Sequence, residues 1–209
     1  MRNSSLFLKF LMDFIGSLVG LLVLSPLLIG IALSIKFTSR GPVFFRQDRL
    51  GRNGKSFKII KFRTMVVQQE VEGVYSFVDS IDDPRITKVG KVLRATSLDE
   101  LPQLFNVLMG EMSLIGPRPP VLRHPYEYKD YSDYQRQRFL MKPGITGLTQ
   151  VIVRNSVTWQ ERILMDVKYI ERFTIWLDIK ILFVTLQRVI KPENIYTPSD
   201  KKGVKIEIE

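Results

Sequence analysis

Residues 10–35 read FLMDFIGSLVGLLVLSPLLIGIALSI and carry a single charge, that of Asp13. As a straight helix this run would be about 39 Å long, which exceeds the roughly 30 Å thickness of a bilayer's hydrocarbon core. The apolar run is too long for a cleavable signal peptide, and no small-residue cleavage site follows it. The stretch therefore predicts a helix that enters a membrane.

The middle of this stretch, Ser25-Pro26, predicts a break in that helix. Proline removes a backbone hydrogen bond and clashes with the preceding turn, and the Ser25 hydroxyl could satisfy the freed carbonyl in lipid. A spanning helix normally carries its positive charge on one side. Here positive residues flank both ends: Arg2, Lys9, Lys36 and Arg40. These flanks suit a re-entrant helix that enters and leaves by the same face, and a kinked spanning helix fits the residues equally well.

Composition limits the partners and the chemistry. The chain of 209 residues has 31 Lys and Arg against 21 Asp and Glu, a net charge of +10. Such an excess favours nucleic acid, anionic lipid headgroups or phosphorylated small molecules. The sequence has no cysteine, which excludes disulfides and thiolate chemistry, and its single histidine excludes a multi-histidine metal site. We interpret that histidine, His124, as a loop residue beside Pro125.

The remainder of the chain predicts an α+β domain that is mostly helical, with one small β-hairpin. Residues 43–65 form the hairpin, because Asn53-Gly54 supplies the positive φ angles that a tight two-residue turn needs. The second strand, at 57–62, is apolar but carries Lys61, and Arg63 follows it. These cations suit either a solvated strand face or a basic wall that faces a phosphate.

Three further segments predict helices. A short amphipathic helix covers 86–97, with Val89, Val92 and Leu93 on one side. Aromatic and basic residues alternate over 122–144, which is typical of a helix at a membrane interface or of a polar helix with buried aromatic stems. One long helix is expected from about 159 to 189. We divide the chain into a membrane segment at 1–38 and a domain with interfacial helices at 39–209.

The acidic pair Asp99-Glu100 has two explanations. Carboxylates are favoured in the first turn of a helix, and Ser97 with Glu100 fits a capping box, which is the more common reason for such a pattern. The functional explanation depends on the neighbouring residues, because a carboxylate can attack phosphorus and a second can hold a divalent metal. Arg94 lies upstream, and the prolines around Arg118 restrict its backbone. Together these residues suggest phosphoryl chemistry at a membrane surface.

Several motifs, in one order over nearly the whole chain, resemble the bacterial sugar transferase family, the small monotopic phosphoglycosyl transferases that start glycan assembly on polyprenol phosphate. The motifs are LSP (24–26), GPVFFRQDRLGRNGKSFKIIKFRTM (41–65), DDPRITKVGKVLRATSLDELPQLFNVLMGEMSLIGPRP (82–119), KPGITGLTQV (142–151) and RNSVTWQERILMDVKYI (154–170). The resemblance implies that the Ser25-Pro26 break makes the helix re-entrant. It places the protein at the bacterial inner membrane, with its catalytic domain on the cytoplasmic face.

The resemblance also implies roles for residues. Asp99 would attack the β-phosphate of a UDP-sugar and release UMP, and polyprenol (undecaprenyl) phosphate would then accept the phosphosugar. Glu100, with Asp99, would hold Mg²⁺. Residues that would contact phosphate or nucleotide are Arg94, Arg118, Lys61, Arg63 and Arg154. Implied partners are the UDP-sugar, the polyprenol phosphate, anionic lipids and downstream glycosyltransferases, and nucleic acid is not among them.

Some positions depart from the family pattern or stay outside the chemistry. Glu111 stands where the family usually has Asp, and Ile152-Val153 replace a common Asn-Gly, which leaves the identity of the sugar open. We interpret Asp166 and Asp178 as ion-pair partners of arginines.

Two rival functions fit part of the sequence. A membrane-tethered basic binding protein explains the charge and the anchor, but it requires neither the acidic pair nor Arg118. A metal-dependent phosphatase on polyprenyl diphosphates would use similar residues without a nucleotide substrate.

Overall fold

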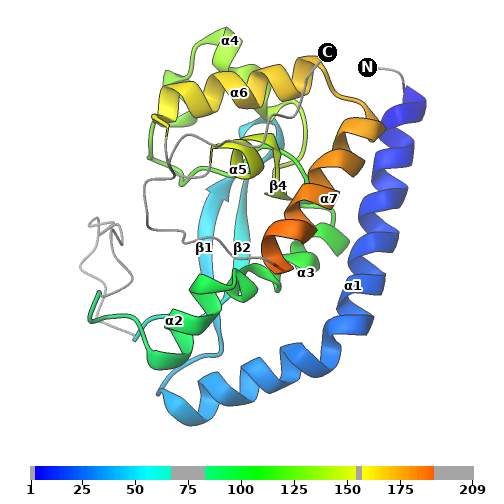
Figure 1. Cartoon of the computed structure of the whole chain (residues 1–209). Helices are drawn as coiled ribbons and strands as arrows, with labels where there is room; N and C mark the ends of the chain where they lie inside the picture. Colours follow the sequence, from blue (N-terminus) through cyan, green and yellow to red (C-terminus); the bar gives the residue numbers. More distant parts are fainter. Residues whose placement is uncertain (1–2, 67–82, 154–156, 191–209) are drawn as a thin grey trace.

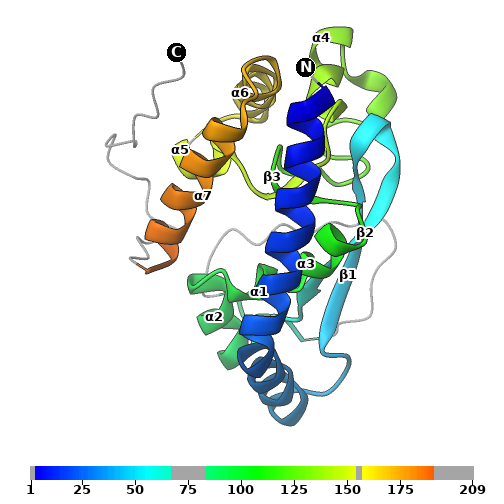
Figure 2. The same cartoon turned by 90° about the vertical axis from the view of Figure 1, so that its right-hand side faces the viewer.

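The computed structural model describes residues 3–66, 83–153 and 157–190 (Figure 1). Its first element is helix α1, Asn3–Thr38, which is 36 residues long. The helix runs along one side of the molecule past α3 and then turns across the end of the molecule near α2 (Figures 1 and 2). By length and composition α1 could cross a membrane, and it is the one such helix in the described part of the chain.

Pro26 lies inside α1, and its neighbour compensates for the missing hydrogen bond. A proline at position 26 has no N–H to donate to the carbonyl of Leu22, four residues earlier. The hydroxyl of Ser25 donates to that same carbonyl oxygen at 2.8 Å. The predicted compensation is therefore confirmed, and the helix changes direction without leaving Leu22 unsatisfied.

The two halves of α1 pack on different parts of the domain. In the first half, Gly16 and Gly20 lie against Leu114 and Leu104, so that α1 and α3 approach closely. In the second half, Ile31 and Ile35 join a buried cluster with Phe62 and Leu93. The outer face remains apolar and exposed, with Phe7, Leu8, Phe10, Phe14, Ile15, Leu18, Val19, Leu22, Val23, Leu27, Ile29, Leu33 and Phe37. This face provides the surface that lipid would cover.

Two buried polar residues attach the first half of α1 to the domain. Lys9 Nζ lies 2.5 Å from Asp178 Oδ2 and donates to the carbonyl of Ile115 at 2.9 Å. Asp13 Oδ1 accepts from Ser113 Oγ and from the Leu114 amide, both at 2.9 Å. The partner of Asp178 is thus a lysine of the membrane helix, and the expectation of an arginine was wrong.

The β-hairpin lies along one side of the domain, with β2 against α3 (Figure 2). Strands β1, Phe44–Leu50, and β2, Ser56–Phe62, pair antiparallel from Phe44↔Phe62 to Leu50↔Ser56. Asn53 and Gly54 have positive φ angles, as predicted. The connection is longer than a two-residue turn, because it includes the 3₁₀ turn η1, Arg52–Gly54, and the Gly51 amide donates to the Lys55 carbonyl.

Short elements follow the hairpin. Helix α2, Lys88–Ala95, begins at Thr87, whose hydroxyl accepts from the Gly90 amide. Val89 and Leu93 of α2 pack inward, whereas Val92 is exposed, contrary to the prediction. The next elements are η2, Leu98–Glu100, α3, Gln103–Leu108, and the short parallel pair β3, Ser113–Ile115, with β4, Gly144–Thr146.

The segment 122–144 has buried aromatic stems. It contains η3, Tyr128–Asp130, α4, Asp133–Arg136, and η4, Gln137–Phe139, and no helix runs through it. Tyr131 and Phe139 are buried with Leu50 and Ile163, with ring centroids 5.1 Å apart. The buried aromatic stems of the second alternative are therefore confirmed, but the single helix that both alternatives assumed was wrong.

The C-terminal helices differ from the prediction of one long helix. After α5, Leu148–Ile152, the structure has α6, Trp159–Glu171, and α7, Ile175–Ile190. The Thr174 hydroxyl accepts from the Leu177 amide and so begins a new helix. The break lets Ile170 of α6 and Ile181 of α7 pack into one cluster with Ile115.

Candidate active site

The acidic pair lies in η2, one turn before α3. Ser97 precedes it in the left-handed region, with φ of 57°, and its side chain makes no capping hydrogen bond. Helix α3 begins at Gln103, and the residue before it, Pro102, provides no side-chain cap. The capping box predicted for Ser97 and Glu100 is therefore absent, and α3 begins three residues after Glu100.

Glu100 is held by two cations from distant parts of the chain. Lys61 Nζ of β2 donates to Glu100 Oε1 at 2.5 Å, and Arg118 Nη2 donates to the same oxygen at 3.3 Å. Burial by itself would raise the pKa of Glu100, but the charges of Lys61 and Arg118 outweigh it and hold the pKa at about 2. Glu100 is therefore ionised and fixed in position at neutral pH.

At Asp99, burial has a larger effect on the pKa than the neighbouring positive charges. Burial raises the pKa of Asp99 to about 6, and the charge of Glu100 adds to this, against the opposing effect of Lys61, Arg94 and Arg118. In the described part of the chain no side chain donates a hydrogen bond to its carboxylate. Two adjacent carboxylates thus differ strongly in basicity, a pattern that separates chemical roles in active sites.

Arg118 is positioned through its backbone. Its carbonyl accepts from Arg138 Nη2 at 3.0 Å, and Arg138 in turn lies 2.6 Å from Asp166 Oδ2. Asp166 also accepts from Thr149 Oγ1 at 2.6 Å, so its predicted role as the partner of an arginine is confirmed. Arg138 and Asp166 are both buried. The ion pair of Arg138 and Asp166 therefore holds the backbone of Arg118 in place.

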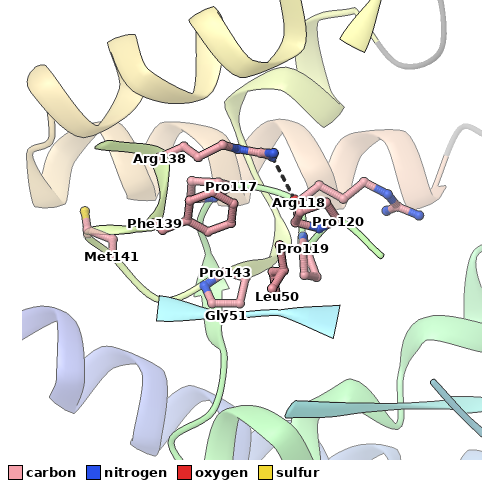
Figure 3. Close-up of a pocket in the computed structure, with 10 residues that line it drawn as sticks. All are labelled: Leu50, Gly51, Pro117, Arg118, Pro119, Pro120, Arg138, Phe139, Met141 and Pro143. Carbon is pink, nitrogen blue, oxygen red and sulfur yellow. Dashed lines mark hydrogen bonds between the residues drawn. The ribbon is translucent and has the colours of Figure 1, made fainter. Parts of the chain in front are cut away.

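The loop that carries Arg118 separates two hollows. Figure 3 shows the first, which is lined mostly by apolar residues: Leu50, Gly51, Pro117, Arg118, Pro119, Pro120, Arg138, Phe139, Met141 and Pro143. The guanidinium of Arg118 points away from the other lining residues, and neither carboxylate of the acidic pair reaches this hollow (Figure 3). The second hollow contains the polar groups: Arg49, Ile59, Lys61, Glu100, Gln103, Arg118, Pro119 and Gly144.

Of the cations named from the sequence, Lys61 and Arg118 meet at Glu100. Arg94 lies in the last turn of α2, and its charge acts on Asp99. Arg63 is buried elsewhere and donates to the Ser39 and Arg40 carbonyls at 3.0 and 2.6 Å, so we omit it from the site. Its guanidinium therefore binds the two residues that follow α1. Arg154 lies outside the described residues.

Two residues of the second hollow were missed by sequence reasoning. Arg49 of β1 donates to the Pro119 carbonyl at 3.1 Å and so connects the hairpin to the arginine loop. Gln103 is 2% exposed and begins α3. An uncharged residue at a helix start gave no signal of its own, and only the packing places it beside Glu100.

Glu111 and Ile152-Val153, which depart from the family pattern, lie outside η2, the element that carries Asp99 and Glu100. Glu111 Oε2 accepts from Asn106 Nδ2 at 2.7 Å, which is a structural contact behind α3. Ile152 ends α5 and Val153 follows it, immediately before the residues outside the description.

The carboxylates suit a magnesium ion only in part. Among the described residues, no group of three or more His, Cys, Asp or Glu side chains could hold a metal. Mg²⁺ is commonly bound by one or two carboxylates together with waters and substrate phosphates. Asp99 and the oxygen of Glu100 that faces neither Lys61 nor Arg118 fit that kind of shared site.

Comparison of the sequence with known protein families identifies the family of this chain. A model of the family described as "Bacterial sugar transferase" matches residues 4–192. The chain belongs to the bacterial sugar transferase family. The match includes nearly all of α1, the hairpin, the acidic pair and the loop that carries Arg118.

Individual members of the bacterial sugar transferase family are closely similar. A UDP-glucose:undecaprenyl-phosphate glucose-1-phosphate transferase of Klebsiella pneumoniae is 46% identical over 183 residues, or 85% of this chain and 39% of the relative. An undecaprenyl-phosphate galactose phosphotransferase of Salmonella typhimurium is 42% identical over 208 residues, 93% of this chain and 43% of the relative. A galactosyl transferase, CpsE, of Streptococcus agalactiae is 42% identical over 201 residues, 90% and 43%. The chain spans about two fifths of the length of these relatives.

Proposed function

We propose that the protein transfers a phosphosugar from a UDP-sugar to polyprenol phosphate, with release of UMP, as a first membrane step of glycan assembly. The observation that supports this most strongly is the unequal acidic pair. Glu100 is fixed by Lys61 and Arg118, while Asp99 is the more basic carboxylate and accepts no side-chain hydrogen bond among the described residues. The more basic carboxylate is the better nucleophile.

The proposed reaction has two steps. A carboxylate oxygen of Asp99 forms a bond to the β-phosphorus of the UDP-sugar, and the bond from that phosphorus to the bridging oxygen breaks, so that UMP leaves with the electron pair. The phosphate oxygen of polyprenol phosphate then forms a bond to the same phosphorus. The acyl-phosphate bond to Asp99 breaks, and polyprenyl-diphosphate-sugar is released.

The surrounding residues stabilise the transferred phosphate. Lys61 and Arg118 hold Glu100 in one place, and their remaining N–H groups and those of Arg94 provide positive charge beside Asp99. When bound between Asp99 and Glu100, Mg²⁺ would neutralise phosphate oxygens.

The position of α1 suits a lipid-linked acceptor. Leu98, next to Asp99, packs with Ile31 and Ile35 of the second half of α1. We propose that α1 is re-entrant in the bacterial inner membrane and that the domain lies on the cytoplasmic face, where anionic lipid headgroups meet its basic surface.

Cysteine labelling tests this topology, since the chain has no native cysteine. Ser4→Cys and Arg40→Cys place single thiols at exposed positions before and after the apolar stretch. In spheroplasts, a membrane-impermeant maleimide should label neither thiol until the membrane is opened. Labelling of Ser4→Cys alone from outside would show a spanning helix.

The names of the relatives suggest the first donors to test. Glucose and galactose occur in those names, so UDP-glucose and UDP-galactose head the panel. The product would serve glycosyltransferases that extend lipid-linked sugars.

The decisive experiment measures UMP release by detergent-solubilised protein with Mg²⁺, polyprenol phosphate and each UDP-sugar. Wild type should release UMP and form a lipid-linked sugar, and Asp99→Asn should do neither. Asp133→Asn, an exposed carboxylate, is the matched control and should retain full activity. Full activity in Asp99→Asn would exclude the proposed nucleophile.

The same assay separates the rivals. Phosphate release from a polyprenyl diphosphate without any nucleotide would indicate a phosphatase. No turnover with any donor, together with salt-sensitive binding to anionic vesicles that survives Asp99→Asn, would indicate a basic binding protein.

A further inference from the structure

Gln103 has a buried donor without a partner, next to the acidic pair. Its side chain is 2% exposed, and in the described part of the chain its Nε2 makes no hydrogen bond. It lines the second hollow together with Lys61, Glu100 and Arg118. A buried amide that stays unpaired destabilises the folded protein, and for that reason such groups are rare in native proteins.

A second buried amide on the same helix shows that the fold can satisfy such a group. Asn106, one turn further along α3, accepts from the Ile60 amide at 3.0 Å. Its Nδ2 donates to the Lys58 carbonyl at 2.8 Å and to Glu111 Oε2 at 2.7 Å. Asn106 therefore joins α3 to β2, whereas Gln103 faces the hollow and contributes no comparable bond.

The neighbours of Gln103 indicate what it would bind. Lys61, Arg118 and Arg49 make the hollow favourable for an anion, and Glu100 already accepts from two of them. A phosphoryl oxygen accepts hydrogen bonds and donates none, so it complements an amide N–H. A neutral amide adds such a bond without further charge and independently of pH.

We propose that Gln103 Nε2 donates a hydrogen bond to a non-bridging oxygen of the phosphate that is transferred through Asp99. This inference rests on the proposed function and adds a phosphate-binding residue to it. The bond forms only when the phosphate is present, which explains why the donor has no partner in the protein alone. Since both steps pass through the same phosphorus, Gln103 acts in each of them.

The test compares Gln103→Leu with Asn106→Leu, two replacements of a buried amide on one helix. Thermal unfolding without substrate is measured first. Gln103→Leu should unfold at the wild-type temperature or above it, because it removes an unsatisfied group, and Asn106→Leu should unfold lower, because it removes three hydrogen bonds.

Activity is measured next as the UMP burst in the absence of polyprenol phosphate, which isolates the first step. Gln103→Leu should slow this burst by on the order of 100-fold, the usual effect of removing one donor to a developing anion. The factor should be equal for every UDP-sugar that wild type accepts. Gln103→Glu, which has the same shape but repels phosphate, should be slower still.

Several results would overturn the inference. If wild type is active and Gln103→Leu keeps its full burst rate, the donor serves no phosphate, and the proposed function survives without it. A loss that differs among UDP-sugars would place Gln103 on the sugar. A fall in unfolding temperature equal to that of Asn106→Leu would make Gln103 a structural residue. If wild type releases no UMP from any donor, the function fails and this inference fails with it.

Discussion

Replacing Asp99 with asparagine should stabilise the protein at neutral and alkaline pH. Burial raises the pKa of Asp99 from an ordinary value of 3.8 to about 6, so the ionised carboxylate is less favourable in the folded chain than in the unfolded one. A difference of this size corresponds to about 3 kcal/mol of stability. The loss begins as pH rises above 3.8 and is complete above pH 6. Asparagine cannot ionise, so the Asp99→Asn variant does not lose this stability as pH rises.

Glu100 gives the opposite prediction. Burial opposes its ionisation, but Lys61 and Arg118 hold its pKa at about 2, against an ordinary value of 4.5. Its charge therefore contributes about 3 kcal/mol of stability above pH 4.5, which is lost as pH falls toward 2. Glu100→Gln should remove this contribution and leave the two cations without their carboxylate.

Thermal unfolding in detergent measures both effects. For a chain of this size, 1 kcal/mol shifts the unfolding temperature by about 2–4 °C. At pH 8 we expect Asp99→Asn to unfold about 6–12 °C above wild type and Glu100→Gln to unfold below wild type by a similar amount. At pH 4 the gain of Asp99→Asn should nearly vanish. An equal gain at both pH values, or destabilisation by both variants at pH 8, would refute the reasoning about this pair.

Two further predictions concern the nucleophile and its support. The rate of the UMP burst divided by the donor concentration, measured without polyprenol phosphate, should fall tenfold for each pH unit below about 6, because Asp99 must be ionised to attack. A burst rate that does not change between about pH 6 and pH 4 would point to Glu100 as the nucleophile instead. Asp166→Ala should destabilise the protein by about 3–5 kcal/mol, since it leaves the buried Arg138 charge unpaired. Asp133→Ala, which removes an exposed carboxylate from a surface ion pair, should leave the unfolding temperature unchanged.

Features that depend on neighbours in the chain were predictable. The bend at Pro26 and its compensation by Ser25 need only the geometry of one helical turn, although α1 continues through the proline without the predicted break. The positive φ angles of Asn53 and Gly54 follow from local chemistry as well. The family motifs added the acidic pair, and two of the predicted cations, Lys61 and Arg118, meet at Glu100.

Features that depend on packing were not predictable. The spacing of Ser97 and Glu100 predicted a helix cap, but Ser97 adopts a left-handed backbone conformation and its side chain makes no capping hydrogen bond. Lys61 of β2 and Arg63 just after it are two residues apart, yet Arg63 binds the residues that follow α1 and Lys61 reaches Glu100. Nothing in the sequence distinguished Gln103, and only the fold shows that its side-chain amide is buried and that its Nε2 has no partner among the described residues.

The sequence by itself determined that this chain has a bent apolar helix, a hairpin and an acidic pair near arginines, because proline, glycine and charge act over a few residues. Only the tertiary structure decided that the two adjacent carboxylates are unequal. Lys61 and Arg118 lie 39 and 18 residues from Glu100 along the chain, and both contact that carboxylate. The basicity of a carboxylate depends on its burial and on the charges within a few ångströms, and the fold sets both.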